Sequence, residues 1–263
     1  MRQFGATIIL AAWALPLCWM LAASVAPEAA LFEGGIGPPT LAHYRAIFAE
    51  RHFWRPVANS LVVAGTTAAL AILIGTPAAY AVARLRLPGA RWILAGVLAV
   101  SVFPQIAIVP TLFLLLRTAG LLDTYPGLVL PYLTFSLPLA VWLLAAFFRR
   151  VPRGLEEAAL MDGATPLRAA LLVVLPVAAP AIATTAILVF LYAWNEFLFA
   201  LSFTLGPERQ TAPVAIALLR GRYQVPWGQV LAAAVVASLP VAAVVLAVQR
   251  RIVSGLTAGA VKG

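Results

Sequence analysis

Charged and reactive side chains are scarce in this 263-residue sequence, and their scarcity excludes several classes of protein. Only 10% of the residues are charged, against roughly 25% in soluble domains. The single cysteine, Cys18, has no partner for a disulfide and is predicted to be an apolar filler. The two histidines, His43 and His52, have no further metal-ligating residues beside them, so neither a metal site nor Ser-His-Asp catalysis is predicted. The one lysine, Lys262, is not part of a G-x-x-x-x-G-K-S/T phosphate loop, so this chain is not predicted to hydrolyse ATP or to bind a cofactor.

Apolar residues make up 63% of the chain, which leaves too little polar surface for a water-soluble protein of this length. The solvent is therefore predicted to be lipid. Charge-free runs, each longer than the roughly 20 residues that cross a bilayer as a helix, predict an all-α polytopic membrane protein with six transmembrane helices. These runs are residues 3–27, 56–83, 92–116, 124–148, 169–195 and 223–249.

The distribution of lysine and arginine predicts the orientation of the six spans. Eleven of these residues fall in short segments on one side, and seven are spread over longer loops on the other side. Because short cytoplasmic loops carry the excess, both termini and the loop at 149–168 are predicted to be cytoplasmic. The net charge of +9 follows from this bias, and the sequence lacks the basic, aromatic-interleaved stretch that would indicate a nucleic-acid partner.

The first run has a second interpretation, because Arg2 precedes it and Ser24-Val25-Ala26 imitates the cleavage site of a signal peptide. The run exceeds the roughly 7–15 apolar residues of a signal core. Pro27 also follows the imitated site and disfavours cleavage. The sequence therefore favours a retained first span.

The polar loop at 149–168 is predicted to contain a short helix over residues 152–162. Pro152 suits the first position of a helix because its missing N–H would have no partner there, and Gly163 suits the left-handed position that ends one. Thr165 and Pro166 are typical of the start of the next helix. An ordinary amphipathic turn between two spans is the alternative interpretation.

One face of this short helix combines small and apolar groups, while Glu156 points elsewhere. The positions on that face are Leu155, Ala158, Ala159 and Asp162. Two adjacent alanines allow the backbone of another protein to approach closely. The pattern therefore indicates a docking surface.

Three segments resemble the permeases of ABC importers. Glu157-Ala158-Ala159, followed after three residues by Gly163 and after nine more by Val173-x-Leu175-Pro176, resembles their "EAA" loop. The ending Gly255–Gly263, G-L-T-A-G-A-V-K-G, resembles the end of the second permease of maltose and trehalose type importers. Residues 188–197 are similar to the fifth span of that family. The resemblance covers most of the chain from about residue 57 onward.

The resemblance implies the architecture of a type I ABC importer permease in the cytoplasmic (inner) membrane of a bacterium or archaeon. Residues 1–56 would form the first span and an outer loop, and residues 57–263 a five-helix core with a coupling helix at about 152–163 and a cytoplasmic tail at 250–263. The implied partners are a second permease, an ATPase dimer that holds ATP and Mg, and an extracytoplasmic sugar-binding protein. The implied function is import of a disaccharide or related sugar by alternating access.

The resemblance also implies three groups of contact residues. Coupling to the ATPase is expected at Glu156, Glu157, Ala158, Ala159, Asp162 and Gly163. A second contact is expected along the tail at Gly255, Thr257, Gly259 and Lys262. By position, a loop that reaches into the binding protein is expected at Arg220, Gly221, Arg222, Tyr223 and Gln224. A plain connector with an aromatic anchor at Trp227 is the alternative for that loop.

Polar groups inside the spans are costly in lipid, so they indicate either a translocation path or packing contacts. Pro104 and Pro110 predict a broken helix around Gln105 with free carbonyls. The candidate path residues are Phe103, Gln105, Tyr192, Trp194, Asn195 and Glu196. For Glu196, pairing near the outer interface is the alternative to a path role.

Other classes of function remain alternatives. A proton-coupled secondary sugar carrier would centre on Glu196, but the sequence has one intramembrane carboxylate and no detectable inverted repeat. A membrane enzyme would need a cluster of nucleophile, base or metal ligands. A scaffold subunit could share the docking pattern without transporting anything.

Overall fold

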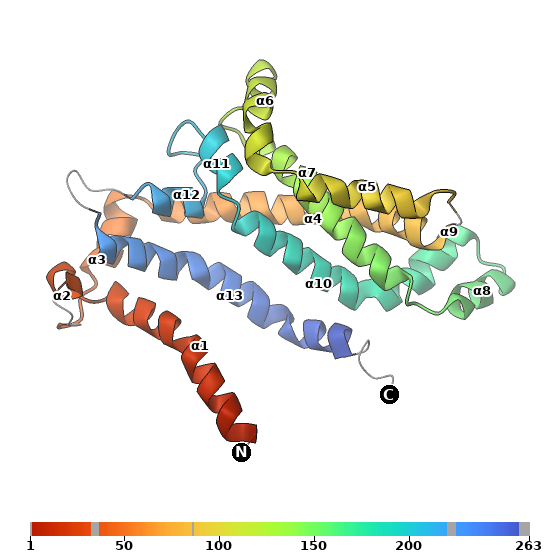
Figure 1. The fold of residues 1–263 in the computed structure, drawn as a ribbon, viewed down its shortest axis with the longest axis horizontal. Coiled ribbons are helices and arrows are strands. Elements are labelled where there is room, and N and C mark those ends of the chain that lie inside the picture. The colour runs from red at the N-terminus through yellow and green to blue at the C-terminus, as the bar shows by residue number, and fades with distance from the viewer. Residues whose placement is uncertain (1, 33–36, 86, 220–224, 258–263) are drawn as a thin grey trace. The chain divides into compact units, whose positions relative to one another are not determined.

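The computed structural model describes residues 2–32, 37–85, 87–219 and 225–257, and every regular element within those ranges is helical (Figure 1). In lipid a helix satisfies all of its backbone N–H and C=O groups within one segment, which is why an apolar chain adopts this form. The elements are α1 Arg2–Ser24, α2 Glu28–Phe32, α3 Ala42–Arg45, the π-helical turn η1 Ala46–Glu50, α4 Trp54–Arg84, α5 Ala90–Val102, α6 Gln105–Thr118, α7 Tyr125–Phe148, α8 Arg153–Met161, α9 Pro166–Ala169, the π-helical turn η2 Ala170–Val174, α10 Leu175–Trp194, α11 Leu198–Phe203, α12 Ala212–Ala217 and α13 Trp227–Thr257.

Four helical segments of the described chain are long and apolar enough to cross a membrane, and a bent pair makes a fifth. The four are Trp54–Arg84, Tyr125–Phe148, Pro166–Trp194 and Trp227–Ala247. They coincide with four of the predicted spans to within a few residues, and α1 occupies the position of the first. The all-α, polytopic fold class is therefore confirmed.

The bent pair is the predicted third span, and its break confirms the expectation from the prolines. Helices α5 and α6 meet at an angle of 88°, with Phe103 and Pro104 in extended conformation between them (Figure 1). Proline has no N–H to continue the helical ladder and disfavours helical dihedrals in the residue before it. Pro77, Pro131, Pro138, Pro180 and Pro240 lie inside helices that continue through them.

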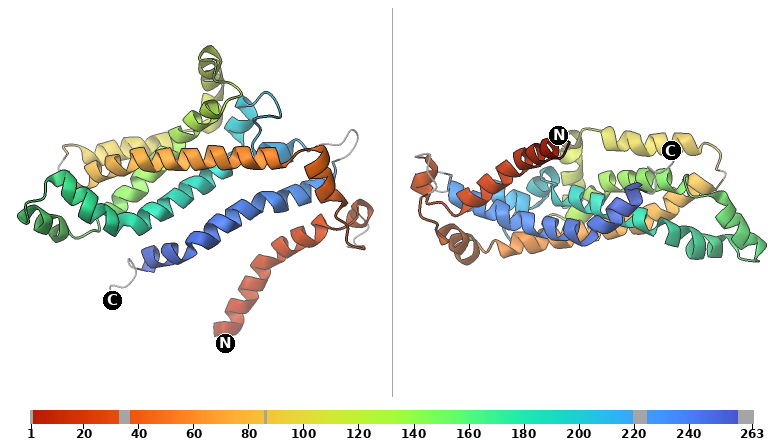
Figure 2. Two further views of the ribbon diagram at one scale, coloured as in Figure 1. Left: turned by 180° about the vertical axis from the view of Figure 1, so that it is seen from behind. Right: turned by 90° about the horizontal axis from the view of Figure 1, so that it is seen from below.

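The chain forms two compact units. Unit 1 combines Met1–Asn59 with Gly206–Ala242, and unit 2 combines Ser60–Leu205 with Ala243–Gly263. In unit 2, α5 and α10 pack against α7, and α8 packs against α9 and η2. Figures 1 and 2 show α8 and α9 together at one end of α7 and α10. The buried core at that end is Ala79, Val141, Leu144, Ala145, Phe148, Val174 and Ala178.

Unit 1 has a small core of its own, and polar contacts hold the start of α13. Its core is Ile47, Phe53, Ala212, Leu219, Ala232, Ala233 and Ala237. The Glu28 carboxylate accepts hydrogen bonds from the backbone N–H groups of Trp227 (2.8 Å) and Gly228 (3.0 Å). A carboxylate at this position satisfies N–H groups that a helix leaves open and complements the helix dipole. The buried His43 ring, bonded through Nε2 to the Ala26 carbonyl at 2.9 Å, packs against Gly228.

Gly228→Ala is expected to lower the stability of the purified chain by about 1–3 kcal/mol, the usual cost of overpacking. A β-carbon at this position would overlap the His43 ring at Cε1 and Nε2. Gly96→Ala in α5 is the matched control, because its Cβ would meet no atom within 4 Å. Thermal unfolding in detergent measures both variants, and equal midpoints would contradict the packing at His43.

Candidate functional site

The candidate coupling helix is α8, and its ends differ slightly from the prediction. It runs over Arg153–Met161, and Pro152 precedes it with a ψ of 130°. The prediction of Pro152 as the first helical residue was therefore wrong by one position, because helical dihedrals begin at Arg153. The predicted end is confirmed, since Gly163 follows the helix with a φ of +84°. The predicted start of the next helix is also confirmed, as the Thr165 hydroxyl accepts from the Arg168 N–H at 3.3 Å.

No residue of α8 is buried, and its outer surface is apolar as well as charged. Leu155 and Leu160 are each 42% exposed and Met161 is 87% exposed. Glu157, Ala158, Asp162 and Gly163 are also exposed, and Ala159 is half-buried. A nine-residue helix with this surface is marginal by itself, so its place depends on a few attachments to the helices behind it.

Glu156 attaches α8 to α4. Its carboxylate accepts a hydrogen bond from the Tyr80 hydroxyl at 2.5 Å and forms an ion pair with the Arg84 guanidinium at 3.3 Å. Tyr80 and Arg84 lie one turn apart at the end of α4, so both side chains project from the same face. Glu156 therefore points away from the Leu155 face, as the helical spacing predicts, and toward α4.

Arg84 holds the same loop at a second point. Its side chain is 3% exposed, and its Nη1 donates to the carbonyl of Val151 at 2.9 Å. Val151 lies between α7 and α8 and is itself buried. A buried guanidinium is costly unless it is paired and hydrogen-bonded, so this arrangement requires both Glu156 and the Val151 carbonyl.

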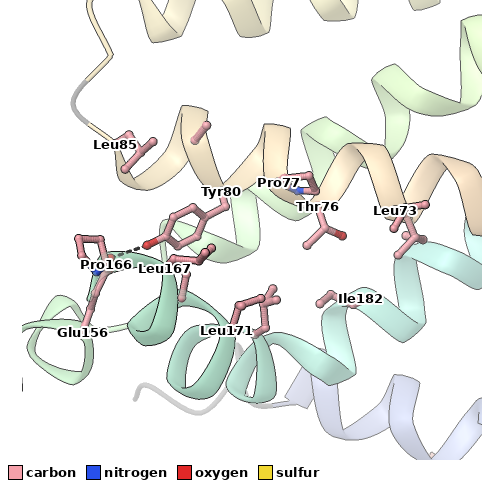
Figure 3. A pocket seen from close by; sticks show the side chains of 14 residues that line it. Leu73, Thr76, Pro77, Tyr80, Leu85, Glu156, Pro166, Leu167, Leu171 and Ile182 are labelled. Carbon is pink, nitrogen blue, oxygen red and sulfur yellow. Dashed lines mark hydrogen bonds between the residues drawn. The ribbon is translucent and has the colours of Figure 1, made fainter. Parts of the chain in front are cut away.

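A cavity of about 680 Å³ lies beside these contacts (Figure 3). Residues of α4 line one wall, and residues of α9, η2 and α10 line the other. Figure 3 shows the Tyr80–Glu156 hydrogen bond at the end of this cavity. The lining residues are Ile72, Leu73, Thr76, Pro77, Tyr80, Ala81, Leu85, Glu156, Pro166, Leu167, Ala170, Leu171, Leu175 and Ile182.

The structure brings together two of the candidate path residues. The Gln105 side chain at the start of α6 donates a hydrogen bond to the Tyr192 hydroxyl of α10 at 2.6 Å. Both side chains are half-buried. Phe103, which lies at the break before α6, is 53% exposed. The structure therefore places a polar pair between α6 and α10, from two residues that are 87 positions apart in sequence.

The other three candidate path residues lie at the end of α10 or just after it. Trp194 is only 4% exposed and packs against Phe190 with ring centroids 5.6 Å apart. Asn195 ends the helix, and its amide donates to the Leu191 carbonyl at 2.8 Å.

Glu196 is 7% exposed, and its carboxylate accepts from the backbone N–H groups of Phe199 (2.8 Å) and Ala200 (3.1 Å). It is thus a buried cap for α11, a role that neither interpretation of this residue included. A role for these side chains in the path stays a prediction.

Several predicted contact residues lie outside the described part of the chain. They are Arg220, Gly221, Arg222, Tyr223, Gln224, Gly259 and Lys262. Gly255 and Thr257 fall within the backbone of α13, which continues past the predicted span to residue 257. The apolar span itself ends at Ala247, close to the predicted end at residue 249, and the tail that begins at residue 250 stays a prediction.

Sequence reasoning missed Tyr80 and Arg84. The signal was present, because two polar groups at i and i+4 at the end of a predicted span can share one partner. Nothing in the sequence indicated which of the acidic residues would be that partner.

The all-helical fold with several apolar spans and an exposed short helix between two of them is that of a polytopic membrane protein. A family model supports this independently, matching residues 71–257. The chain belongs to the family of binding-protein-dependent transport system inner membrane components. It is therefore a permease of an ABC importer rather than a catalytic enzyme, and such systems work with an ATPase and a substrate-binding protein.

Curated relatives match along nearly the whole chain. The trehalose transport system permease protein SugB of Mycobacterium tuberculosis is 46% identical, over 98% of this chain and 95% of that protein. The sulfoquinovosyl glycerol transport system permease protein SmoH of Agrobacterium fabrum is 42% identical, over 100% and 94%. The trehalose/maltose transport system permease protein MalG of Thermococcus litoralis is 38% identical, over 98% and 95%.

A solved structure shares the fold. A chain of a bacterial ABC transporter involved in the import of the acidic polysaccharide alginate aligns with a TM-score of 0.74 at 24% identity. The alignment covers 95% of this chain and 96% of that chain.

Glu196→Gln is expected to lower stability by about 1–2 kcal/mol, because an amide offers one acceptor oxygen where the carboxylate accepts two N–H groups. Glu208→Gln is the matched control, since that carboxylate is 67% exposed in an ion pair with Arg55 and contributes less than about 1 kcal/mol. Denaturant unfolding of both variants measures the difference. Equal losses of stability in the two variants would contradict the capping role of Glu196.

Proposed function

We propose that the chain is the permease subunit of an ATP-driven importer for a disaccharide or related glycoside of the trehalose and maltose type. The observation that carries the proposal is α8, an exposed helix attached to the spans through Glu156 that leaves Glu157 and its neighbours open to a partner. The relatives named for trehalose, trehalose/maltose and sulfoquinovosyl glycerol transport support the substrate class, because each of these molecules is a glycoside.

The proposed mechanism is alternating access driven by a separate ATPase dimer that binds ATP and Mg. Closure of the ATPase displaces α8, and the spans on either side of it turn with it. Glu157 and Asp162 offer carboxylates to basic or backbone donors of the ATPase, while Ala158 and Ala159 allow close approach. Gly163 supports the role of a hinge, because its φ of +84° is accessible to few other residues.

The same proposal assigns the remaining partners. A second permease completes the path, and an extracytoplasmic sugar-binding protein delivers the substrate. Both chain termini and α8 face the cytoplasm, which the excess of arginine in the short loops supports. Contacts with the binding protein are assigned to residues 220–224 and contacts with the ATPase to the segment from Gly255 to Gly263, on the resemblance of the sequence alone.

Within the membrane, we assign the polar pair Gln105 and Tyr192 to the translocation path. A sugar needs hydrogen-bonding groups and aromatic surfaces, and this pair provides both at a break in the helix. Backbone carbonyls freed by such a break are tolerated in a membrane where they line a water-filled cavity. Phe103, exposed at the same break, adds an aromatic surface.

The proton-coupled alternative has less support. Glu196 would have to exchange protons during transport, yet its carboxylate is buried and accepts two backbone N–H groups. Sugar uptake that persists in ATP-depleted, energised vesicles would favour that alternative.

Glu157→Lys combined with Gly163→Pro is expected to reduce sugar-stimulated ATP hydrolysis of the assembled complex by about tenfold, equivalent to about 1.4 kcal/mol of lost interaction. The charge reversal repels basic groups, and proline cannot adopt the positive φ of Gly163. The assay uses the reconstituted permeases, ATPase and binding protein with trehalose and maltose. Glu50→Lys, which reverses an exposed charge on η1, is the control. Full stimulation in the double variant would refute the coupling role.

Gln105→Leu is expected to lower sugar uptake about threefold, which corresponds to the roughly 0.6 kcal/mol typical of a hydrogen bond between membrane helices. Uptake of labelled sugar into proteoliposomes measures the effect across several glycosides. Ser238→Ala is the control, because its hydroxyl bonds only the Val235 carbonyl of its own helix at 2.7 Å. A path role further requires that the loss differ between sugars, and a uniform loss would indicate packing instead.

A further inference from the structure

Polar contacts attach α8 directly to α4. The cavity of about 680 Å³ lies along one side of α4, between residues of α4 and residues of α9, η2 and α10, and Glu156 also lines it. Elsewhere α4 shares a packed core with η2 and α10, through Ala79, Val174 and Ala178. Motion of α8 can therefore reach α4 directly through Glu156 and its two partners, and indirectly through η2 and this core.

The three side chains are each held on more than one side. The Tyr80 ring packs edge-on against Phe148, the last residue of α7, with centroids 5.9 Å apart. Arg84 bonds the Val151 carbonyl as well as Glu156. The contacts thus form at the meeting point of α4, the end of α7 and α8. Because hydrogen bonds and ion pairs have short ranges, they transmit a displacement only while their atoms stay together.

We propose that Tyr80, Arg84 and Glu156 form a coupling latch that makes α8 and α4 move as one body when the ATPase displaces α8. Glu156 is a positioning residue on the inner side of α8, distinct from the outward Glu157. Through the latch, displacement of α8 by the ATPase also moves α4 directly. The spans on either side of α8 move because the chain connects them to it. This inference rests on the proposed function, because it concerns how that importer couples ATP hydrolysis to transport.

The first test measures uptake and ATP hydrolysis separately in proteoliposomes that hold the complete transporter. Tyr80→Phe and Glu156→Gln are expected to lower the sugar imported per ATP hydrolysed by about tenfold, because the first removes the charge-assisted hydrogen bond and the second removes the charge that strengthens it and that pairs with Arg84. Hydrolysis stimulated by the binding protein should stay close to that of the unchanged complex. The double variant should lose little more than Glu156→Gln alone, since both substitutions act on the contact between Tyr80 and Glu156.

Arg91→Gln is the matched control for charge, because Arg91 lies over the Trp92 ring of α5 with no described link to α8. It should leave the ratio of uptake to hydrolysis unchanged. A merely structural role would lower uptake and hydrolysis together and would leave their ratio intact. That outcome, with the complex assembled, would overturn the latch.

A second measurement keeps the latch testable if a variant fails to assemble. In a Cys18→Ser background, Tyr80→Cys and Glu156→Cys are joined by a short bifunctional thiol reagent. If α4 and α8 move as one body, the joined transporter should retain ATP-dependent uptake, and its uncrosslinked form should be uncoupled. Loss of uptake on crosslinking would show that the two helices must separate, which overturns the proposal. Absence of ATP-dependent uptake in the unchanged complex would instead overturn the proposed function.

Discussion

The need to satisfy every backbone N–H and C=O group without water determines most of this structure. An uninterrupted helix meets that need within its own segment, so the apolar runs become long helices. Each interruption leaves orphan groups that side chains must satisfy. Three of the interruptions in unit 2 are the breaks between α5 and α6 and between α10 and α11, and the loop around α8. Gln105, Glu196 and Glu157, three of the polar side chains considered for function, lie at these places.

The sequence predicted features that depend on local chemistry. Gly163 and Thr165 were located because a left-handed helix end and a helix cap each need particular residue types. The break at Pro104 was located because proline removes a donor. In each case the deciding atoms are within a few residues of one another. Five of the six predicted spans were likewise found from the length of their apolar runs, four as single helical segments and one as the bent pair of α5 and α6.

The sequence did not predict contacts between distant segments. Helical spacing placed Glu156 away from the Leu155 face, but it could not show that Tyr80 and Arg84 lie on that side. Trp194 and Asn195 were grouped with Glu196 by proximity in sequence, yet each side chain has a different task at the end of α10. The aromatic and charged residues at 194–196 thus marked a helix end correctly, but they did not show what each side chain does there. The two compact units divide the chain differently from a first span followed by a five-helix core, because Gly206–Ala242 groups with Met1–Asn59.

The separation of Tyr80 from Glu156 by 76 positions has a consequence for biosynthesis. At roughly 5–20 residues per second, a ribosome needs several seconds to make the intervening segment. During that interval α4 is complete while its carboxylate partner does not yet exist. Arg84 must remain near water, which its long side chain at the end of α4 permits. The guanidinium can contact the Val151 carbonyl and Glu156 only after α7 and the loop that follows it have been made.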